Sequence, residues 1–106
     1  LLFEQPSAYL EKLHAHVTDM QPGAGYPSHT DEHEVAIVLF SGTVETLGKQ
    51  VGPGGSIYYA AGEPHGMRNV GNEPARYLVF EFHGPKRVTT QAPQERSASA
   101  SLQPVA

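Results

Sequence analysis

Residues 54–69 read GGSIYYAAGEPHGMRN, and this stretch decides the fold because it joins two short strands through one turn. The segment SIYYA is rich in β-branched and aromatic residues, which predicts a β-strand. The segment GEP predicts a turn that ends at His65. A strand that begins there places His65, Met67 and Asn69 on one face and Arg68 on the other, because side chains alternate along a strand.

The same organisation continues on both sides of this stretch. Single glycines and prolines, 11 and 9 in number, separate short apolar runs, as in β proteins with many turns. The further predicted strands are EVAIVLF (34–40), GTVETL and KQVG (42–47 and 49–52, a hairpin around Gly48) and ARYLVFEFH (75–83). No stretch keeps a period of 3.6 residues. The chain is therefore predicted to be all-β, an antiparallel sandwich or barrel.

Near the start of the chain, apolar and polar residues alternate in LHAHV (13–17). A period of two predicts a half-buried strand. We expect Leu13, Ala15 and Val17 to face the core, and His14 and His16 to face solvent.

The end of the chain differs in composition from the rest. Residues 85–106 contain few large apolar side chains and an alternating Ser/Ala segment, so they cannot bury enough surface to offset the entropy of ordering. We therefore expect one β-barrel domain over residues 1–84 and a flexible tail or linker over residues 85–106.

The composition excludes several classes of function. The formal net charge is −4 and no cluster of Lys or Arg occurs, so we expect no nucleic-acid partner. No apolar run is long enough to span a membrane, and the start shows no signal-peptide pattern, so we expect no membrane partner and a cytoplasmic location. The absence of Cys excludes thiolate zinc sites and cysteine nucleophiles.

Histidine is the main source of reactive groups, with six in the chain. The densest cluster is SHTDEHE (28–34). If this segment is extended, His29, Asp31 and His33 share one face, whereas a turn inside it would change that parity. Imidazole and carboxylate groups are suitable ligands for a divalent ion such as Zn, Fe, Ni, Mn or Cu.

These residues resemble the cupin family, whose second motif is G-x5-P-x-G-x2-H-x3-N. Gly54, Gly62, His65 and Asn69 match it at the family's spacing, and Ala60 stands where proline is usual. The resemblance covers about residues 8–83. It implies a single antiparallel double-stranded β-helix, a jelly-roll barrel of the RmlC-like kind.

The family's first motif, G-x5-H-x-H-x3-4-E-x6-G, matches more loosely. His29 and Glu34 satisfy its H-x4-E part, with Gly42 one residue late and Pro27 at the position of the other histidine. Alternatively, His29 is the first histidine and Asp31 replaces the second, which leaves Glu34 one residue too close.

The resemblance implies that His29, Glu34 and His65 bind a divalent metal ion in the mouth of the barrel. Asp31, His33 or water would supply the fourth ligand. Two or three coordination positions would remain open for a substrate or dioxygen.

The pocket around that ion is predicted to include Tyr58, Tyr59, Met67 and Asn69. Alternation places Tyr58 and Tyr59 on opposite faces, so only one of them points inward, and the sequence does not say which. Asp31 or either tyrosine is a candidate for an acid/base or binding role.

The leading functional hypothesis is a metal-binding cupin that acts on, or binds, a small polar organic molecule, sugar-like or a keto acid. The alternatives are a non-catalytic ligand-binding or sensor module of a larger protein, and a structural dimerisation domain with a vestigial site. We also expect a homodimer, because exposed strand edges and apolar strands such as YLVFEF need protection.

Overall fold

The computed structural model describes residues 1–85, so the predicted tail lies almost entirely outside the described residues. Within these residues the chain forms strands and no helix, and hence no helix that could cross a membrane. The strands are β1 (Phe3–Gln5), β2 (Lys12–Met20), β3 (Gly25–His29), β4 (Glu34–Ser41), β5 (Val44–Thr46), β6 (Lys49–Val51), β7 (Ser56–Tyr59), β8 (His65–Asn69) and β9 (Ala75–His83).

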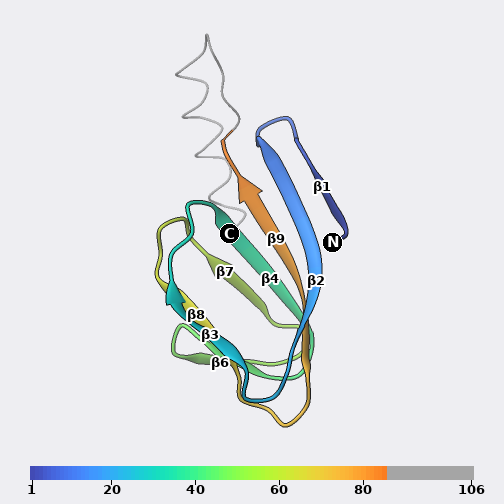
Figure 1. The fold of residues 1–106 in the computed structure, drawn as a ribbon, viewed down its shortest axis with the longest axis vertical. Helices are drawn as coiled ribbons and strands as arrows, with labels where there is room; N and C mark the ends of the chain where they lie inside the picture. The colour runs from blue at the N-terminus through green and yellow to red at the C-terminus, as the bar shows by residue number, and fades with distance from the viewer. Residues whose placement is uncertain (86–106) are drawn as a thin grey trace.

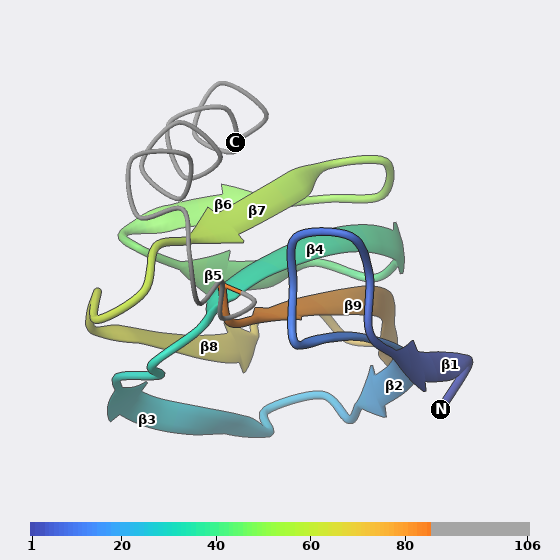
Figure 2. The same cartoon turned by 90° about the horizontal axis from the view of Figure 1, so that it is seen from above.

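The strands form two antiparallel sheets that face each other (Figures 1 and 2). The larger sheet has the order β1-β2-β9-β4-β7, and the smaller sheet has the order β3-β8-β5-β6. Neighbouring strands are often distant in sequence, as when β9 pairs with both β2 and β4. This arrangement confirms the predicted all-β jelly roll.

Local sequence accounts for several strand limits. The second strand of the opening stretch begins at His65, and the last strand runs over Ala75–His83, as predicted. The hairpin between β5 and β6 turns at Leu47 and Gly48, whose φ angles are 52° and 75°. Two positive φ angles in a two-residue loop suit the right-handed twist of a hairpin, and Gly48 accepts such an angle without strain.

The core cluster lies between the sheets and extends from Val35 and Tyr59 to the end of the sandwich that holds Leu39 and Val44. Leu39 of β4 and Val44 of β5 are 1% and 0% exposed, and Met67 of β8 packs in the same cluster. We call this end, where β2 ends and β9 begins, the closed end. The opposite end, where β2 begins and β9 ends at the top of Figure 1, is the open end.

Strand β2 faces the other way from the prediction. His16 lines the space between the sheets and Val17 is 37% exposed, so the histidines of β2 point inward. Burial lowers the pKa of His16, and neighbouring His14 adds to this effect. The prediction was wrong because the outer face of the larger sheet is apolar too. Ala15, for example, is completely buried on that face, where it pairs with Phe3 of β1.

Candidate metal centre

Three potential metal ligands meet at the open end of the smaller sheet. His29, at the end of β3, pairs directly with His65, at the start of β8, and Asp31 follows in the next loop. Asp31 Oδ2 lies 3.4 Å from the Nε2 atom of His29 and 3.4 Å from that of His65. One ligand atom from each of the three residues lies within 4.8 Å of the other two.

Backbone carbonyls orient both imidazoles. Nδ1 of His65 lies 3.0 Å from the carbonyl oxygen of Glu63, and Nδ1 of His29 lies 3.2 Å from that of Pro27. A carbonyl can only accept, so each Nδ1 carries the proton when its imidazole is neutral. In this tautomer each Nε2 has a free lone pair, and it is directed toward Asp31. A histidine that binds a metal through Nε2 requires this tautomer.

Tyr59 holds the ring of His65 from the side of the larger sheet. The two rings stack with centroids 3.8 Å apart and planes 8° apart. The Thr46 hydroxyl donates to the Gly66 carbonyl at 2.6 Å, so the Tyr59 hydroxyl is the donor in its own 2.5 Å bond to Thr46. Burial raises the pKa of Tyr59, which remains a neutral donor. His65, only 4% exposed, is therefore fixed before any ion arrives.

The spacing of these three groups fits a divalent ion. Ligands that bind zinc at about 2.0–2.2 Å lie roughly 3.0–3.5 Å from one another. The 3.4 Å separations on either side of Asp31 fall in this range. A set of two imidazoles and one carboxylate that leaves further coordination positions open also binds iron in oxygenases.

Glu34 lies apart from this cluster, contrary to the prediction from the sequence. The loop at residues 30–33 reverses the parity of the segment, and β4 begins at Glu34. The inward positions of β4 start at Val35, so Glu34 is on the outer face with Tyr58. The Tyr58 hydroxyl donates to Glu34 Oε2 at 2.5 Å, and this bond raises the pKa of Tyr58 to about 12. Tyr59 is thus the tyrosine that faces inward.

The structure favours the second alignment of the first cupin motif. Gly23, His29, Asp31, Val35 and Gly42 follow the family's spacing when Asp31 takes the place of the second histidine. Val35 then stands at the position of the family's glutamate. It is 6% exposed and lines the same cavity as the three polar groups, so an apolar side chain fills the space of that carboxylate.

The other predicted site residues have different surroundings. His33 lies next to His83 and Glu81, with its Nε2 3.7 Å from Glu81 Oε1. Met67 shares the buried face of β8 with His65, as predicted, but packs in the core. Asn69 is at the closed end, where it donates to the carbonyls of Met20 and Glu73 and accepts from Gly71 N–H. Its observed contacts are structural.

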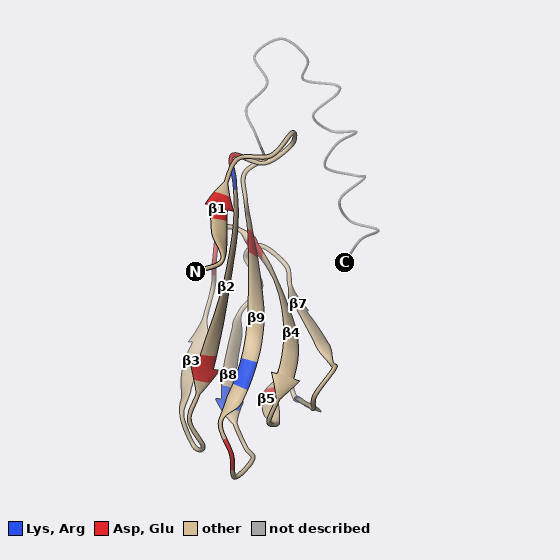
Figure 3. Cartoon of the chain, turned by 90° about the vertical axis from the view of Figure 1, so that its right-hand side faces the viewer, with Lys and Arg blue, Asp and Glu red and all other residues tan. Residues whose placement is uncertain are grey.

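The candidate centre opens into a cavity of about 290 Å³ between the sheets. The cavity is lined by His16, Thr18, Tyr26, His29, Asp31, His33, Val35, Ile37, Tyr59, His65, Tyr77, Val79 and Glu81. Among the described residues, no Lys or Arg lines this cavity. The Lys and Arg side chains of residues 1–85 lie elsewhere on the strands (Figure 3). Asp31 and Glu81 have imidazole neighbours but no Lys or Arg partner in this cavity, which favours a cation here.

Sequence reasoning missed His16 and Glu81 as cavity residues. The only local signal was the pair of alternating motifs HAH (14–16) and EFH (81–83), each with two polar groups on one face. Which face points inward depends on how the two strands pair within the sheet, and that is not local information.

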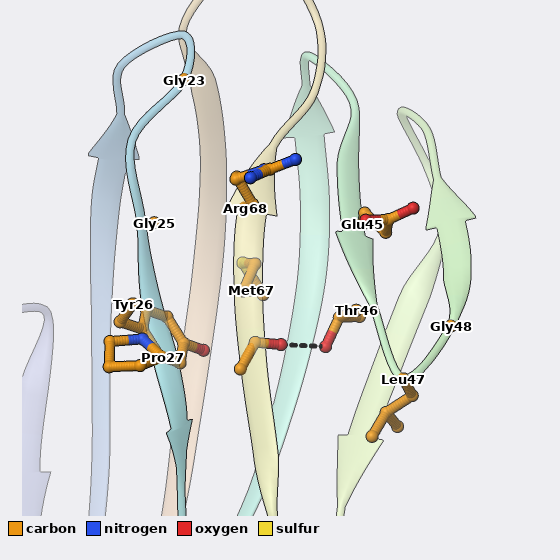
Figure 4. A pocket seen from close by; sticks show the side chains of 11 residues that line it. Gly23, Gly25, Tyr26, Pro27, Glu45, Thr46, Leu47, Gly48, Met67 and Arg68 are labelled. Atoms are coloured by element: carbon orange, nitrogen blue, oxygen red, sulfur yellow. Dashed lines mark hydrogen bonds between the residues drawn. The ribbon is translucent and has the colours of Figure 1, made fainter.

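A larger hollow of about 690 Å³ lies on the outer side of the smaller sheet and includes Gly25, Gly66 and Arg68 (Figure 4). Along this hollow β3 and β8 approach closely. A Cβ atom at Gly66 would lie 2.9 Å from the carbonyl oxygen of Tyr26, so glycine is required for the approach. We assign the candidate site to the smaller cavity, because the convergent imidazoles and carboxylate are there.

Comparisons with known proteins agree with this fold. The family model of the cupin domain matches residues 16–81. The search of curated proteins found no match.

Solved structures with a similar fold come from proteins of different kinds. The Schizosaccharomyces pombe Cnp3 cupin domain has a TM-score of 0.65 at 20% identity, over 79% of this chain and 58% of its own. The polyketide cyclase RemF from Streptomyces resistomycificus has a TM-score of 0.62 at 23% identity, over 81% and 68%. The DMSP lyase DddQ from Ruegeria pomeroyi has a TM-score of 0.60 at 27% identity, over 74% of this chain but 43% of its own. The chain therefore spans less than half of that lyase.

Proposed function

Because the chain belongs to the cupin family, we propose that it binds a divalent metal ion through His29, Asp31 and His65 and holds a small organic molecule beside that ion. The observation that carries the proposal is the pair of Nε2 atoms directed at one carboxylate oxygen, each at 3.4 Å. Glu34, on the outer face, is not part of this ligand set.

The cavity limits the size and character of the ligand. A volume of about 290 Å³ is at the lower end of the range for small-molecule pockets. Imidazole, carboxylate and tyrosine groups line it together with Val35 and Ile37, which suits a small molecule with several oxygens, such as a sugar-like compound or a keto acid. A bound ion would act as a Lewis acid on a carbonyl or hydroxyl group, or would bind dioxygen.

The chain's own residues would position that molecule. Tyr59 keeps the His65 ring in place by stacking on it, and Asp31 is shared by both imidazoles. Glu81 faces the same cavity and can accept a hydrogen bond or a proton from a ligand hydroxyl.

Metal analysis of protein purified without a histidine tag tests the proposal. We expect the content of a first-row divalent metal to fall by one equivalent per chain in His65→Ala and in Asp31→Asn. Glu34→Gln is the matched control, because it removes a nearby carboxylate on the outer face and should leave the metal content unchanged. Metal lost from Glu34→Gln and kept in Asp31→Asn would show that this ligand set is wrong.

A binding or sensor module is the second candidate function. Its support is Val35, which stands where the family's first motif has a glutamate. A site that lacks the carboxylate of the family's first motif has three protein ligands and holds its ion less firmly. A panel of sugars and keto acids, tested by calorimetry and then for product by NMR, separates the two functions. Product formation supports an enzyme, whereas metal-dependent binding without product supports a module. A chain that binds neither metal nor ligand fits a structural domain with a vestigial site.

We also propose a homodimer. Its support is the apolar outer face of the larger sheet, where Phe40 is 50% exposed and Val17 is 37% exposed. Light scattering should give twice the monomer mass at micromolar concentration, and a monomer there would argue against this assembly.

A further inference from the structure

A second group of potential ligands lies on the larger sheet, away from the first centre. His14 and His16 share the inner face of β2, because one residue separates them. Glu81 of β9 pairs directly with His14 across the sheet. One ligand atom from each of the three lies within 4.8 Å of the other two. Register thus brings a His-x-His pair and a carboxylate to one place.

A hydrogen bond joins the two imidazoles. Nε2 of His14 lies 2.7 Å from Nδ1 of His16, in a part-buried hydrogen bond, and the rings meet edge to face with centroids 4.9 Å apart. Two nitrogen lone pairs directed at one point can be bridged by a proton or by a divalent cation. Because Glu81 is adjacent, the cation would also be neutralised in part.

Strand β1 provides a hydrogen-bond partner for the second ring nitrogen of His14. Nδ1 of His14 lies 2.8 Å from Glu4 Oε1, so this nitrogen donates to the carboxylate. Nε2 then carries the lone pair that accepts from His16 Nδ1 and that could bind an ion in its place. Lys12 Nζ lies 3.5 Å from the other oxygen of Glu4 and balances its charge. A carboxylate on the far nitrogen of an imidazole fixes the ring and makes it a stronger ligand.

Glu81 is also close to His33 and His83, which form a competing set. The Nε2 of His83 lies 2.9 Å from Glu81 Oε1, and that of His33 lies 3.7 Å away. Within residues 1–85, His14 is the only member of either set with a carboxylate on its other ring nitrogen. We therefore favour the set on β2, and the competing set supplies the control for the test below.

We propose that His14, His16 and Glu81 form a second site for a divalent transition-metal ion. This site goes beyond the proposed function, since none of its ligands belongs to the first centre. His16 and Glu81 line the same cavity as His29, Asp31 and His65, so a ligand in that cavity can contact both sites.

The test uses a background from which the first centre has been removed. In the double variant Asp31→Asn, His65→Ala, titration with Zn²⁺ should still load one equivalent per chain. The imidazole ¹⁵N resonances of His14 and His16 should shift together as it does. Adding His14→Ala or His16→Ala should abolish this equivalent, whereas His83→Ala, the matched control, should retain it.

A variant outside the ligand set guards against loss of folding. Glu4→Gln keeps all three ligands and should weaken Zn²⁺ binding in the same background by about 10–100-fold. Loading that shifts His33 and His83 instead, or no loading of the background variant, overturns the proposal. The first centre is read separately, as the difference in loading between the native chain and the double variant.

Discussion

At the closed end of the sandwich, Leu39, Val44 and Asn69 are each at most 1% exposed, and they fill the space between the sheets. At the open end, the inner positions carry groups such as His33 and Glu81, which remain partly exposed. The two ends use the same strands and the same alternation. Stability should therefore be concentrated at the closed end, and chemistry at the open end.

The largest expected effect is at the closed end. Leu39→Ala should lower the free energy of unfolding by about 2–5 kcal/mol, because it leaves a cavity in the core. Phe40→Ala, at the next residue and 50% exposed, should cost less than about 1 kcal/mol. Denaturant unfolding of the metal-free proteins measures both. Equal losses would mean that the core does not end where we place it.

Asn69 provides the next largest effect. Asn69→Ala removes the partner of three backbone groups, those of Met20, Glu73 and Gly71, and should cost about 1–3 kcal/mol. Asn72→Ala, in the exposed turn that follows β8, is the control and should change stability little. Zn²⁺ binding by the folded Asn69→Ala protein should match that of the native chain. A specific loss of binding would place Asn69 in the site rather than in the support of the fold.

The smallest effect concerns the outer face near the open end. The hydrogen bond to Glu34 raises the pKa of Tyr58 from 10.0 to about 12, so it stabilises the fold fully below about pH 10. That contribution is lost as the pH rises from about 10 to about 12. Tyr58→Phe should make stability decline less steeply over this window, although burial also raises the pKa values of Tyr59 and Tyr77.

Tyr9→Phe is the control for Tyr58→Phe. Tyr9 is 61% exposed, and its replacement leaves the bond between Tyr58 and Glu34 in place. Unfolding followed at pH 8, 10 and 12 should show the native decline in Tyr9→Phe. If Tyr58→Phe declines as steeply as the native chain, this hydrogen bond does not contribute to the pH dependence.

Local signals explain what could be predicted from the sequence. The strand at His65 and the hairpin at Gly48 follow from turn residues and alternation within a few positions. His65 could be assigned to the inner face on the same grounds. These features depend on neighbours along the chain, which the sequence shows directly.

Other features depend on which face of a strand a residue occupies and on how strands pair. For these features the prediction from the sequence was wrong or absent. The loop at residues 30–33 turned Glu34 outward and Val35 inward, a shift of one position that exchanges the faces. On β2 an apolar outer face made the histidines look exposed. Glu81 meets His14 only because β9 pairs with β2 in one particular register, and no local pattern specifies this pairing.

Each proposed ion is carried mainly by one sheet. His29 and His65 belong to the smaller sheet, and His14, His16 and Glu81 belong to the larger one. The distance between the two proposed ions therefore depends on how the two sheets pack against each other. Substitutions near Leu39, in the core and remote from both ligand sets, would then tune which molecules can bridge the two ions.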